Sequence, residues 1–140
     1  MKTDPHNLQR FVDAQAPVYE QVRAELRVGR KTTHWIWFIF PQVSGLGYSP
    51  MAQRFAIAGR GEAEGYLQHP LLGPRLAECT MLVNQHAGED IVDIFGDIDA
   101  MKFRSSMTLF ANATRDNEIF LEALNNFCGG QVDELTLAKL

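Results

Sequence analysis

The chain has 140 residues, of which 46% are hydrophobic and 21% are charged, and its formal net charge is −4. This length and composition are typical of one globular domain that buries enough apolar surface to fold without disulfides or metals, so we expect a single domain over residues 1–140. The net negative charge argues against a nucleic-acid-binding protein, because such domains are usually basic.

Cysteine and histidine usage excludes several kinds of site. Cys79 and Cys128 form no CxxC pair, and the four histidines are scattered along the chain. We therefore expect two buried thiols, no disulfide framework, no metal site and no cofactor. The longest apolar run, residues 35–40, is far shorter than the roughly 20 residues of a membrane span, and no apolar stretch of signal-peptide length opens the chain. The expected location is the cytosol, with no membrane partner, and the sequence leaves the oligomeric state open.

Signals for helix starts and ends recur along the chain. Asp4 before Pro5 and Ser49 before Pro50 each predict an N-cap followed by proline at the first helical position, and Gly29 predicts a helix end. The helices expected from apolar residues at helical spacing cover residues 5–15, 17–28, 50–58, 62–68, 75–86, 91–95, 98–113, 118–127 and 134–140.

Further signals set boundaries in the second half of the chain. The Gly73–Pro74 pair is expected to interrupt the chain before the fifth of these helices. Asp97 or Asp99 is expected to cap the longest helix, and Asp133 is expected to cap the last one.

Residues 35–40 are the one candidate strand, because the run WIWFIF is rich in aromatic and β-branched residues. A lone strand forms no sheet, since its backbone hydrogen bonds need a partner. We therefore expect a buried irregular or helical segment there. The predicted fold class is all-α, with seven to nine helices in one compact domain and no substantial sheet.

Charge is unevenly distributed between Leu26 and Arg60. The segment contains no Asp or Glu, and its basic residues are Arg27, Arg30, Lys31, Arg54 and Arg60. Aromatic residues, Trp35 and Trp37 among them, lie between these cations. Aromatic faces beside guanidinium groups suit an anionic, nucleotide-like ligand, because the rings stack on a base and the cations meet phosphate. The alternative is an aromatic core below a solvated surface on which the arginines are scattered.

A ligand site in this region gives each candidate residue a role. The basic candidates would contact phosphate, the tryptophans would stack, the polar side chains would orient the ligand, and a helix N-terminus would add backbone N–H groups. In that order the candidates are Arg30, Arg54 and Lys102; Trp35 and Trp37; Gln42 and Ser105; and Ser49, with His34 beside them in the aromatic run. No residue is assigned a catalytic role.

The expected helix over residues 98–113 has polar residues where packing alone favours Leu or Ala. Helical spacing puts its residues on three faces: Phe103, Met107 and Phe110; Met101, Ser105 and Thr108; and Lys102, Ser106 and Leu109. Two interpretations stay open. Either the hydroxyls bond back to helix carbonyls, or Lys102 and one hydroxyl lie at the rim of a ligand site.

Four ordered motifs connect the chain to a known family. They are HWIWFIFPQ at 34–42, SPMAQRF at 49–55, YLQHPLLGPRL at 66–76 and KFRSSMTLF at 102–110. Together they resemble the bacterial family catalogued as domain of unknown function 1810, over about residues 8–137. The resemblance implies a compact, mainly α-helical domain and no established activity.

The order of the motifs is also similar to that of the NADAR family, helical proteins linked to ADP-ribose and to cleavage of N-glycosidic bonds in riboflavin-pathway intermediates. That similarity implies a site for an ADP-ribose-like ligand. The chain departs from the pattern at the helix that opens with Ser49, where Pro50 and Met51 replace an acidic residue. Glycosidic cleavage needs a carboxylate near the anomeric carbon. The candidates to supply it are Glu62, Asp93, Asp97 and Asp99.

The sequence leaves three functions open. The first is a binding module or degenerate enzyme for a phosphorylated, nucleotide-like small molecule. The second is a non-enzymatic protein-interaction domain whose apolar patch a partner buries. The third is an N-glycosidase or ADP-ribose-processing hydrolase. We rank them in this order.

Overall fold

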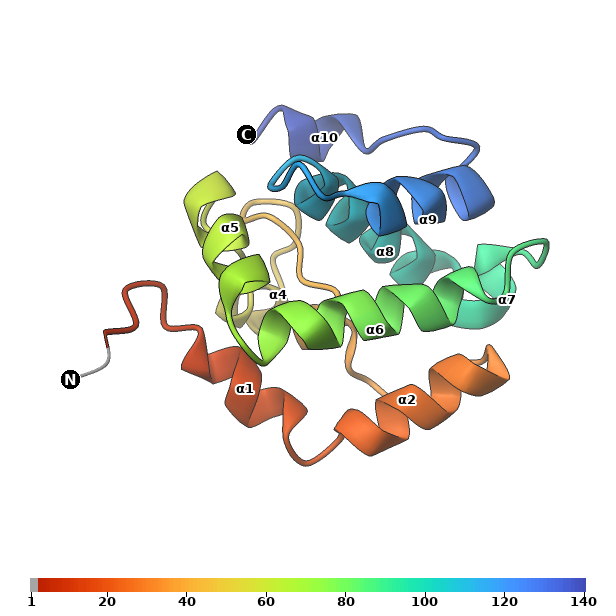
Figure 1. The fold of residues 1–140 in the computed structure, drawn as a ribbon, viewed down its shortest axis with the longest axis horizontal. Helices are drawn as coiled ribbons and strands as arrows, with labels where there is room; N and C mark the ends of the chain where they lie inside the picture. The colour runs from red at the N-terminus through yellow and green to blue at the C-terminus, as the bar shows by residue number, and fades with distance from the viewer. Residues whose placement is uncertain (1–2) are drawn as a thin grey trace.

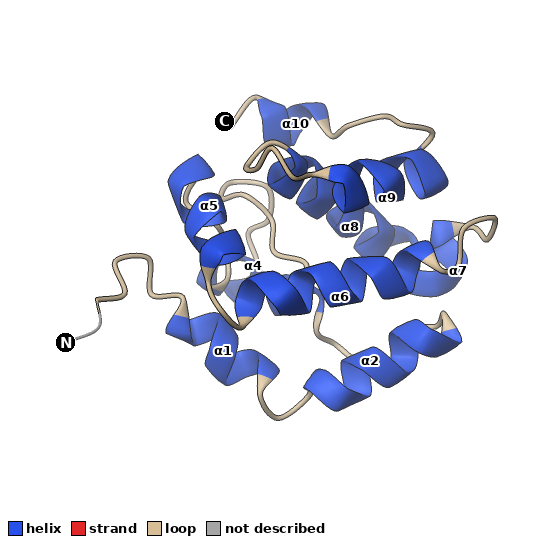
Figure 2. Cartoon of the chain, in the orientation of Figure 1, coloured by secondary structure: helices blue, strands red, loops and turns tan. Residues whose placement is uncertain are grey.

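The computed structural model describes residues 3–140, and these form ten α-helices and one isolated parallel bridge between Val43 and Ile57. The predicted all-α class is confirmed, with one helix more than the upper end of the predicted range (Figure 2). The helices are α1 (Gln9–Gln15), α2 (Tyr19–Val28), α3 (Ile36–Ile39), α4 (Pro50–Arg54), α5 (Arg60–Gln68), α6 (Leu72–Asn84), α7 (Ile91–Phe95), α8 (Asp97–Ala111), α9 (Glu118–Cys128) and α10 (Glu134–Leu137). Within the described part of the chain, no helix is long and apolar enough to span a membrane.

The helix α8 lies at the centre of the packing. It contacts α3, α5, α7, α9 and α10, while α6 packs between α2 and α9 (Figure 1). Every residue from Ser105 to Ala111 is buried. The first half of α8 is partly exposed, with Ile98 and Met101 at the surface. The buried C-terminal half of α8 therefore anchors the helix, and its N-terminal half presents side chains to solvent.

Two predicted helix boundaries are confirmed by their local chemistry. Gly29 ends α2 in the left-handed conformation, with φ of 82°, and a Cβ there would lie 2.8 Å from the His86 ring. Only glycine adopts this conformation without strain. Ser49 caps α4, because its Oγ accepts a hydrogen bond of 3.1 Å from the Ala52 N–H.

Other boundaries differ from the prediction: α4 ends at Arg54 rather than at residue 58, and two helices begin at other residues. The helix α1 begins at Gln9 rather than directly after Asp4, whose carboxylate still accepts hydrogen bonds from the backbone N–H groups of Leu8 and Gln9. The helix α6 begins at Leu72, so the glycine that follows lies inside its first turn.

Gly73 is therefore a packing residue and not a break. A Cβ at this position would lie 2.2 Å from the backbone oxygen of Leu67, so no larger residue fits where α6 meets the end of α5. The N-terminus of α6 is capped from outside the helix: His69 Nδ1 accepts from the N–H groups of Leu71 and Leu72.

The aromatic segment 35–40 is buried except for the half-buried Trp37, and it contains the short helix α3. This agrees with the prediction of a buried irregular or helical segment in place of a lone strand. Trp35, Ile36, Phe38, Ile39 and Phe40 belong to the hydrophobic core. The segment is held at its start by Glu25 of α2, whose carboxylate accepts a 3.1 Å hydrogen bond from Trp35 Nε1.

Candidate functional site

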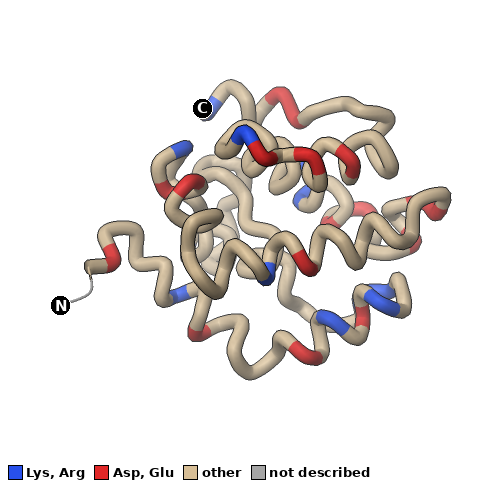
Figure 3. Tube along the Cα trace, in the orientation of Figure 1, with Lys and Arg blue, Asp and Glu red and all other residues tan. Residues whose placement is uncertain are grey.

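In the fold, carboxylates from other segments contact two of the basic side chains of the acid-free segment 26–60. Arg30 contacts Glu89, with 3.3 Å between Nη1 and Oε1, and Lys31 contacts Asp99, with 2.7 Å between Nζ and Oδ2. Lys and Arg gather near the end of α2, and acidic residues lie on neighbouring segments (Figure 3). Carboxylates from other parts of the chain therefore neutralise two of the five cations.

The two tryptophans have different environments. Trp35 is 1% exposed and donates to Glu25, so it is a core residue and has no face available for a ligand; its predicted stacking role is wrong. Trp37 is half-buried, and Lys102 Nζ lies 5.3 Å from the centroid of its ring, within cation–π range. The Trp37 indole N–H is shielded from solvent and finds no acceptor among residues 3–140.

Three predicted ligand-binding residues, Gln42, Lys102 and Ser105, line one pocket of about 230 Å³. It lies between the exposed half of α8, the start of α10 and the loop that follows α3. Its complete lining is Gln42, Leu46, Gly47, Ile98, Met101, Lys102, Ser105, Asp133 and Leu135. The six other predicted residues do not line it: Arg30, His34, Trp35, Trp37, Ser49 and Arg54.

An apolar rim surrounds the polar part of this pocket. Ile98 is 70% exposed, Met101 is 71% exposed and Leu135 is 67% exposed, although all three are large apolar side chains. Exposed apolar residues that are grouped around polar groups are typical of ligand sites, where apolar walls surround a few oriented hydrogen-bonding groups.

Two lysines share one carboxylate beside the pocket. Asp99 Oδ2 lies 2.7 Å from Lys31 Nζ, and Asp99 Oδ1 lies 3.8 Å from Lys102 Nζ. The Lys31 side chain is only 6% exposed and lies over the Trp35 ring, with 5.1 Å between Nζ and the ring centroid. Since Lys31 holds the shorter contact, the positive charge of Lys102 is the less compensated of the two.

Asp133 places a carboxylate in the same pocket. Its Oδ2 accepts hydrogen bonds from Ser105 Oγ at 2.8 Å and from Thr136 Oγ1 at 2.5 Å. Its backbone N–H donates to Thr108 Oγ1 at 3.0 Å. These contacts tie α10 to α8 and fix the carboxylate relative to Lys102.

The loop wall of the pocket depends on two glycines. Gly45 has φ of 93°, and a Cβ there would lie 2.8 Å from Lys139 Nζ. A Cβ on Gly47 would lie 2.8 Å from the Cβ of Ala52 on α4. The positive φ of Gly45 and the close approach of Gly47 to Ala52 therefore both favour glycine in this loop.

Sequence reasoning expected Asp133 only as a helix cap, and it considered Asp99 both as a cap and as a candidate carboxylate for glycosidic cleavage. Neither side chain makes a capping hydrogen bond to its helix. The spacing Asp99, Lys102, Ser105 is a signal that does identify the site, because residues three apart share a helix face. Grouping Lys102 and Ser105 on different faces separated two residues that line the same pocket.

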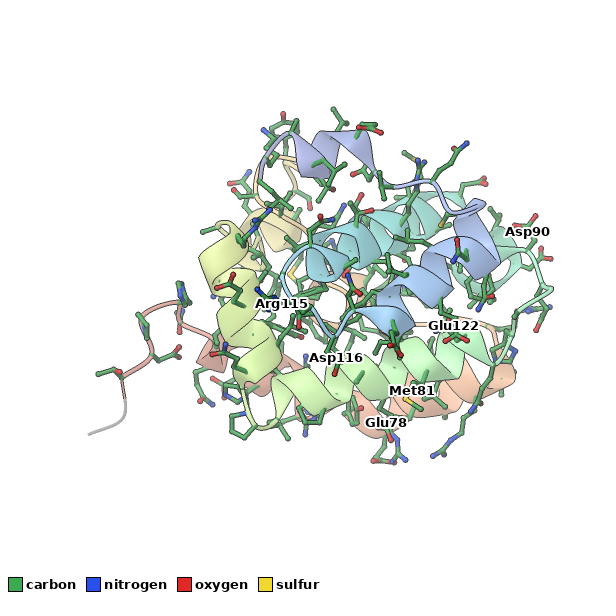
Figure 4. All side chains as sticks on the ribbon, turned by 45° about the horizontal axis from the view of Figure 1, so that its top comes forward. Glu78, Met81, Asp90, Arg115, Asp116 and Glu122 are labelled. Atoms are coloured by element: carbon green, nitrogen blue, oxygen red, sulfur yellow. The ribbon has the colours of Figure 1, made fainter. Side chains whose placement is uncertain are left out.

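Two other hollows in the described structure lack this combination. A pocket of about 350 Å³ between α6 and α9 has Met81 and Asp116 in its wall; Figure 4 shows Met81 on α6 and Asp116 next to Arg115. Neither Lys nor Arg lines it. A hollow of about 960 Å³ beside α1 and α5 is lined by Asp4 and His69, whose side chains already accept backbone hydrogen bonds as caps.

Comparison with known proteins gives a family and a fold without an activity. The model of the family described as "Protein of unknown function (DUF1810)" matches residues 5–140, which confirms the resemblance found in the sequence motifs. The crystal structure of the conserved hypothetical protein Rv1873 from Mycobacterium tuberculosis is similar over 98% of each chain, with 57% sequence identity and a TM-score of 0.96. The comparison with curated proteins found no match.

Proposed function

We propose that this chain, which belongs to the family of proteins of unknown function DUF1810, binds a small phosphorylated, nucleotide-like molecule in the pocket between α8, α10 and the loop after α3. The proposal assumes a bacterial cytosolic protein, as the sequence predicts. Lys102 contacts the phosphate, Gln42 and Ser105 orient the ligand, and the apolar rim contacts its less polar part.

The observation that supports the proposal is the arrangement of two lysines around one carboxylate. Lys31 is nearly buried and forms the shorter contact with Asp99, so Lys102 keeps charge to offer to an anion. Its ammonium group also lies over the face of Trp37, which is outside the pocket lining, and this contact leaves the charge of Lys102 unneutralised. A partly desolvated ammonium group interacts with phosphate more strongly than one in bulk water does.

The size of the pocket limits what it encloses. At about 230 Å³ it is smaller than the roughly 300–1,000 Å³ that typically encloses a drug-sized ligand. A ligand as large as ADP-ribose would therefore place one part in the pocket and the rest over the rim formed by Ile98, Met101 and Leu135.

A thermal-shift screen tests the proposal. The panel contains inorganic phosphate, ribose 5-phosphate, AMP, ADP-ribose and NAD. A ligand present at 100 times its Kd adds about 2.7 kcal/mol to the free energy of unfolding, which raises the Tm of a domain of this size by roughly 10 °C.

Two variants locate the binding. Lys102→Ala is expected to abolish the shift, because it removes the cation that contacts phosphate. Arg54→Ala is the matched control, since Arg54 is exposed and does not line the pocket, and it is expected to keep the full shift. A shift that survives Lys102→Ala contradicts the proposal. No shift with any member of the panel would favour a protein-interaction surface formed by the exposed apolar residues.

A second candidate, glycosidic cleavage, is favoured by the carboxylates near Lys102. Asp99 lies beside the pocket and Asp133 lines it, whereas Glu62 is committed to a buried ion pair with Arg10 at 2.7 Å. A carboxylate can stabilise an oxocarbenium-like transition state. Chromatography of AMP, ADP-ribose and NAD incubated with the protein separates the two functions: a free base supports cleavage, and intact ligands that bind support binding alone.

A further inference from the structure

We infer that the group enclosed by the pocket is a phosphorylated pentose, two adjacent hydroxyl groups of which donate hydrogen bonds to Asp133. The inference rests on the proposed phosphate contact of Lys102 and adds the chemistry of the other end of the ligand. The open acceptor positions of Asp133 call for hydrogen-bond donors on the ligand.

Asp133 already accepts two hydrogen bonds through one of its two carboxylate oxygens. A carboxylate oxygen has two lone-pair positions. Both positions on Oδ2 are used by hydroxyl donors, Ser105 Oγ at 2.8 Å and Thr136 Oγ1 at 2.5 Å. Oδ1 makes no hydrogen bond to any residue from 3 to 140, so two acceptor positions remain on a residue that lines the pocket.

Two acceptor positions on one oxygen match a pair of hydroxyl groups on neighbouring ring carbons, each of which donates one hydrogen bond. An Asp or Glu side chain accepts a hydrogen bond from the ribose 2′-OH in dinucleotide-binding proteins. Hydrogen bonds to a charged acceptor are about twice as strong as those between neutral groups, so the loss of one hydroxyl has a measurable effect on binding.

Lys102 and Asp133 both line the pocket, so one small ligand can reach both charged groups. Lys102 and Ser105 are three residues apart on α8, which is about 4.5 Å along the helix axis, and Asp133 is bound to Ser105. A ligand with a phosphate at one end and hydroxyl groups at the other can therefore contact both residues. The pocket volume of about 230 Å³ also suits one sugar phosphate.

The pentose phosphate has two chemical sources, a free sugar phosphate or a mononucleotide. In a mononucleotide the base would lie on the apolar rim, where Ile98 and Met101 are exposed. Both sources present the same phosphate and hydroxyl groups to Lys102 and Asp133.

Isothermal titration calorimetry with ribose 5-phosphate, 2-deoxyribose 5-phosphate and AMP tests the inference. The wild-type protein is expected to bind ribose 5-phosphate about tenfold more tightly than the 2-deoxy compound, since one hydroxyl contact is missing. AMP that binds more tightly than ribose 5-phosphate identifies a nucleotide as the source, and AMP that binds no more tightly identifies the free sugar phosphate.

Asp133→Asn isolates the contribution of the carboxylate. The amide oxygen can still accept from Ser105 and Thr136, so the fold is retained, while the NH₂ group replaces the open acceptor with a donor. The variant is expected to bind both sugar phosphates equally, at the level of the 2-deoxy compound. Glu134→Gln, an exposed neighbour outside the pocket, is expected to keep the tenfold preference.

The outcomes separate this inference from the proposed function. Equal binding of the two sugar phosphates by wild type overturns the role of Asp133, and the proposed function stands if Lys102→Ala still weakens both. A preference for the ribo compound that persists in Asp133→Asn also overturns the inference. If Asp133→Asn fails to fold, Ser105→Ala replaces it. This variant removes the Ser105 hydroxyl that holds Asp133 Oδ2 in place, so it is expected to reduce the preference for the ribo compound. An unchanged preference contradicts the inference.

Discussion

Glu25 holds the start of the aromatic segment through five hydrogen bonds. Its carboxylate accepts from the backbone N–H groups of Thr32 and Thr33, from the Thr33 hydroxyl, from Trp35 Nε1 and from Gln21 Nε2. Burial raises the pKa of the Glu25 carboxyl, but the hydrogen bonds from Thr33 and Thr32 outweigh it and lower the pKa to about 2.

Glu25→Gln is expected to lower the free energy of unfolding by about 3 kcal/mol at pH 7. The NH₂ group of the glutamine would face N–H and O–H donors, and the charge-assisted hydrogen bonds would be lost. Folding lowers the pKa of the Glu25 carboxyl below its ordinary value of 4.5, so the ionised carboxylate stabilises the folded state. This stabilisation is fully present at pH values above 4.5. The contribution is lost as pH falls from about 4.5 towards about 2, so the difference between wild type and variant is smaller at pH 3 than at pH 7.

Urea unfolding at the two pH values checks this. Glu20→Gln is the control on the same helix, because the Glu20 side chain is 81% exposed and is expected to change stability by less than about 0.5 kcal/mol. An equal effect of Glu25→Gln at pH 3 and pH 7 would show that the charged form does not hold the segment.

At the scale of elements, Lys31 and Asp99 join the segment after α2 to the first turn of α8. The Lys31 backbone N–H also donates to the Ile94 carbonyl of α7 at 2.8 Å. Asp99→Asn leaves the nearly buried Lys31 ammonium group without its carboxylate, so we expect a loss of about 2 kcal/mol in the free energy of unfolding.

Chemical denaturation of Asp97→Asn provides the control for this prediction. Asp97 is exposed in the same turn and is expected to contribute less than about 1 kcal/mol through the helix dipole. A loss in Asp99→Asn no larger than that in Asp97→Asn would mean that the Lys31 contact adds nothing to helix docking.

The elements also show which features the sequence predicts and why. Boundaries set by one residue's own chemistry, such as Gly29 and Ser49, are predicted correctly. The start of α6 is not, because it depends on a contact between Gly73 and Leu67 that only the folded chain creates. Apolar spacing gives the helices, whereas contacts with the residues just before them set the starts of α1 and α6.

At the scale of the whole molecule, sequence reasoning found part of the candidate site. Gln42 lines the same pocket as Lys102 and Ser105, as proposed, although it is far from them along the chain. Trp35 was included because an aromatic run does not reveal which face is buried. Asp133 was missed because its proximity to Ser105 depends on the docking of α10 against α8.

Nuclear magnetic resonance of the two tryptophan indole N–H groups tests the central claim most directly. The chain has two tryptophans, and only Trp37 lies beside Lys102. Titration with ribose 5-phosphate or AMP is expected to shift the Trp37 indole signal and to leave that of Trp35, which is bound to Glu25 in the core, unchanged. The shift is expected to disappear in Lys102→Ala and to persist in Arg54→Ala. A ligand that binds without moving the Trp37 signal, or that moves it equally in Lys102→Ala, would contradict the assignment of this pocket.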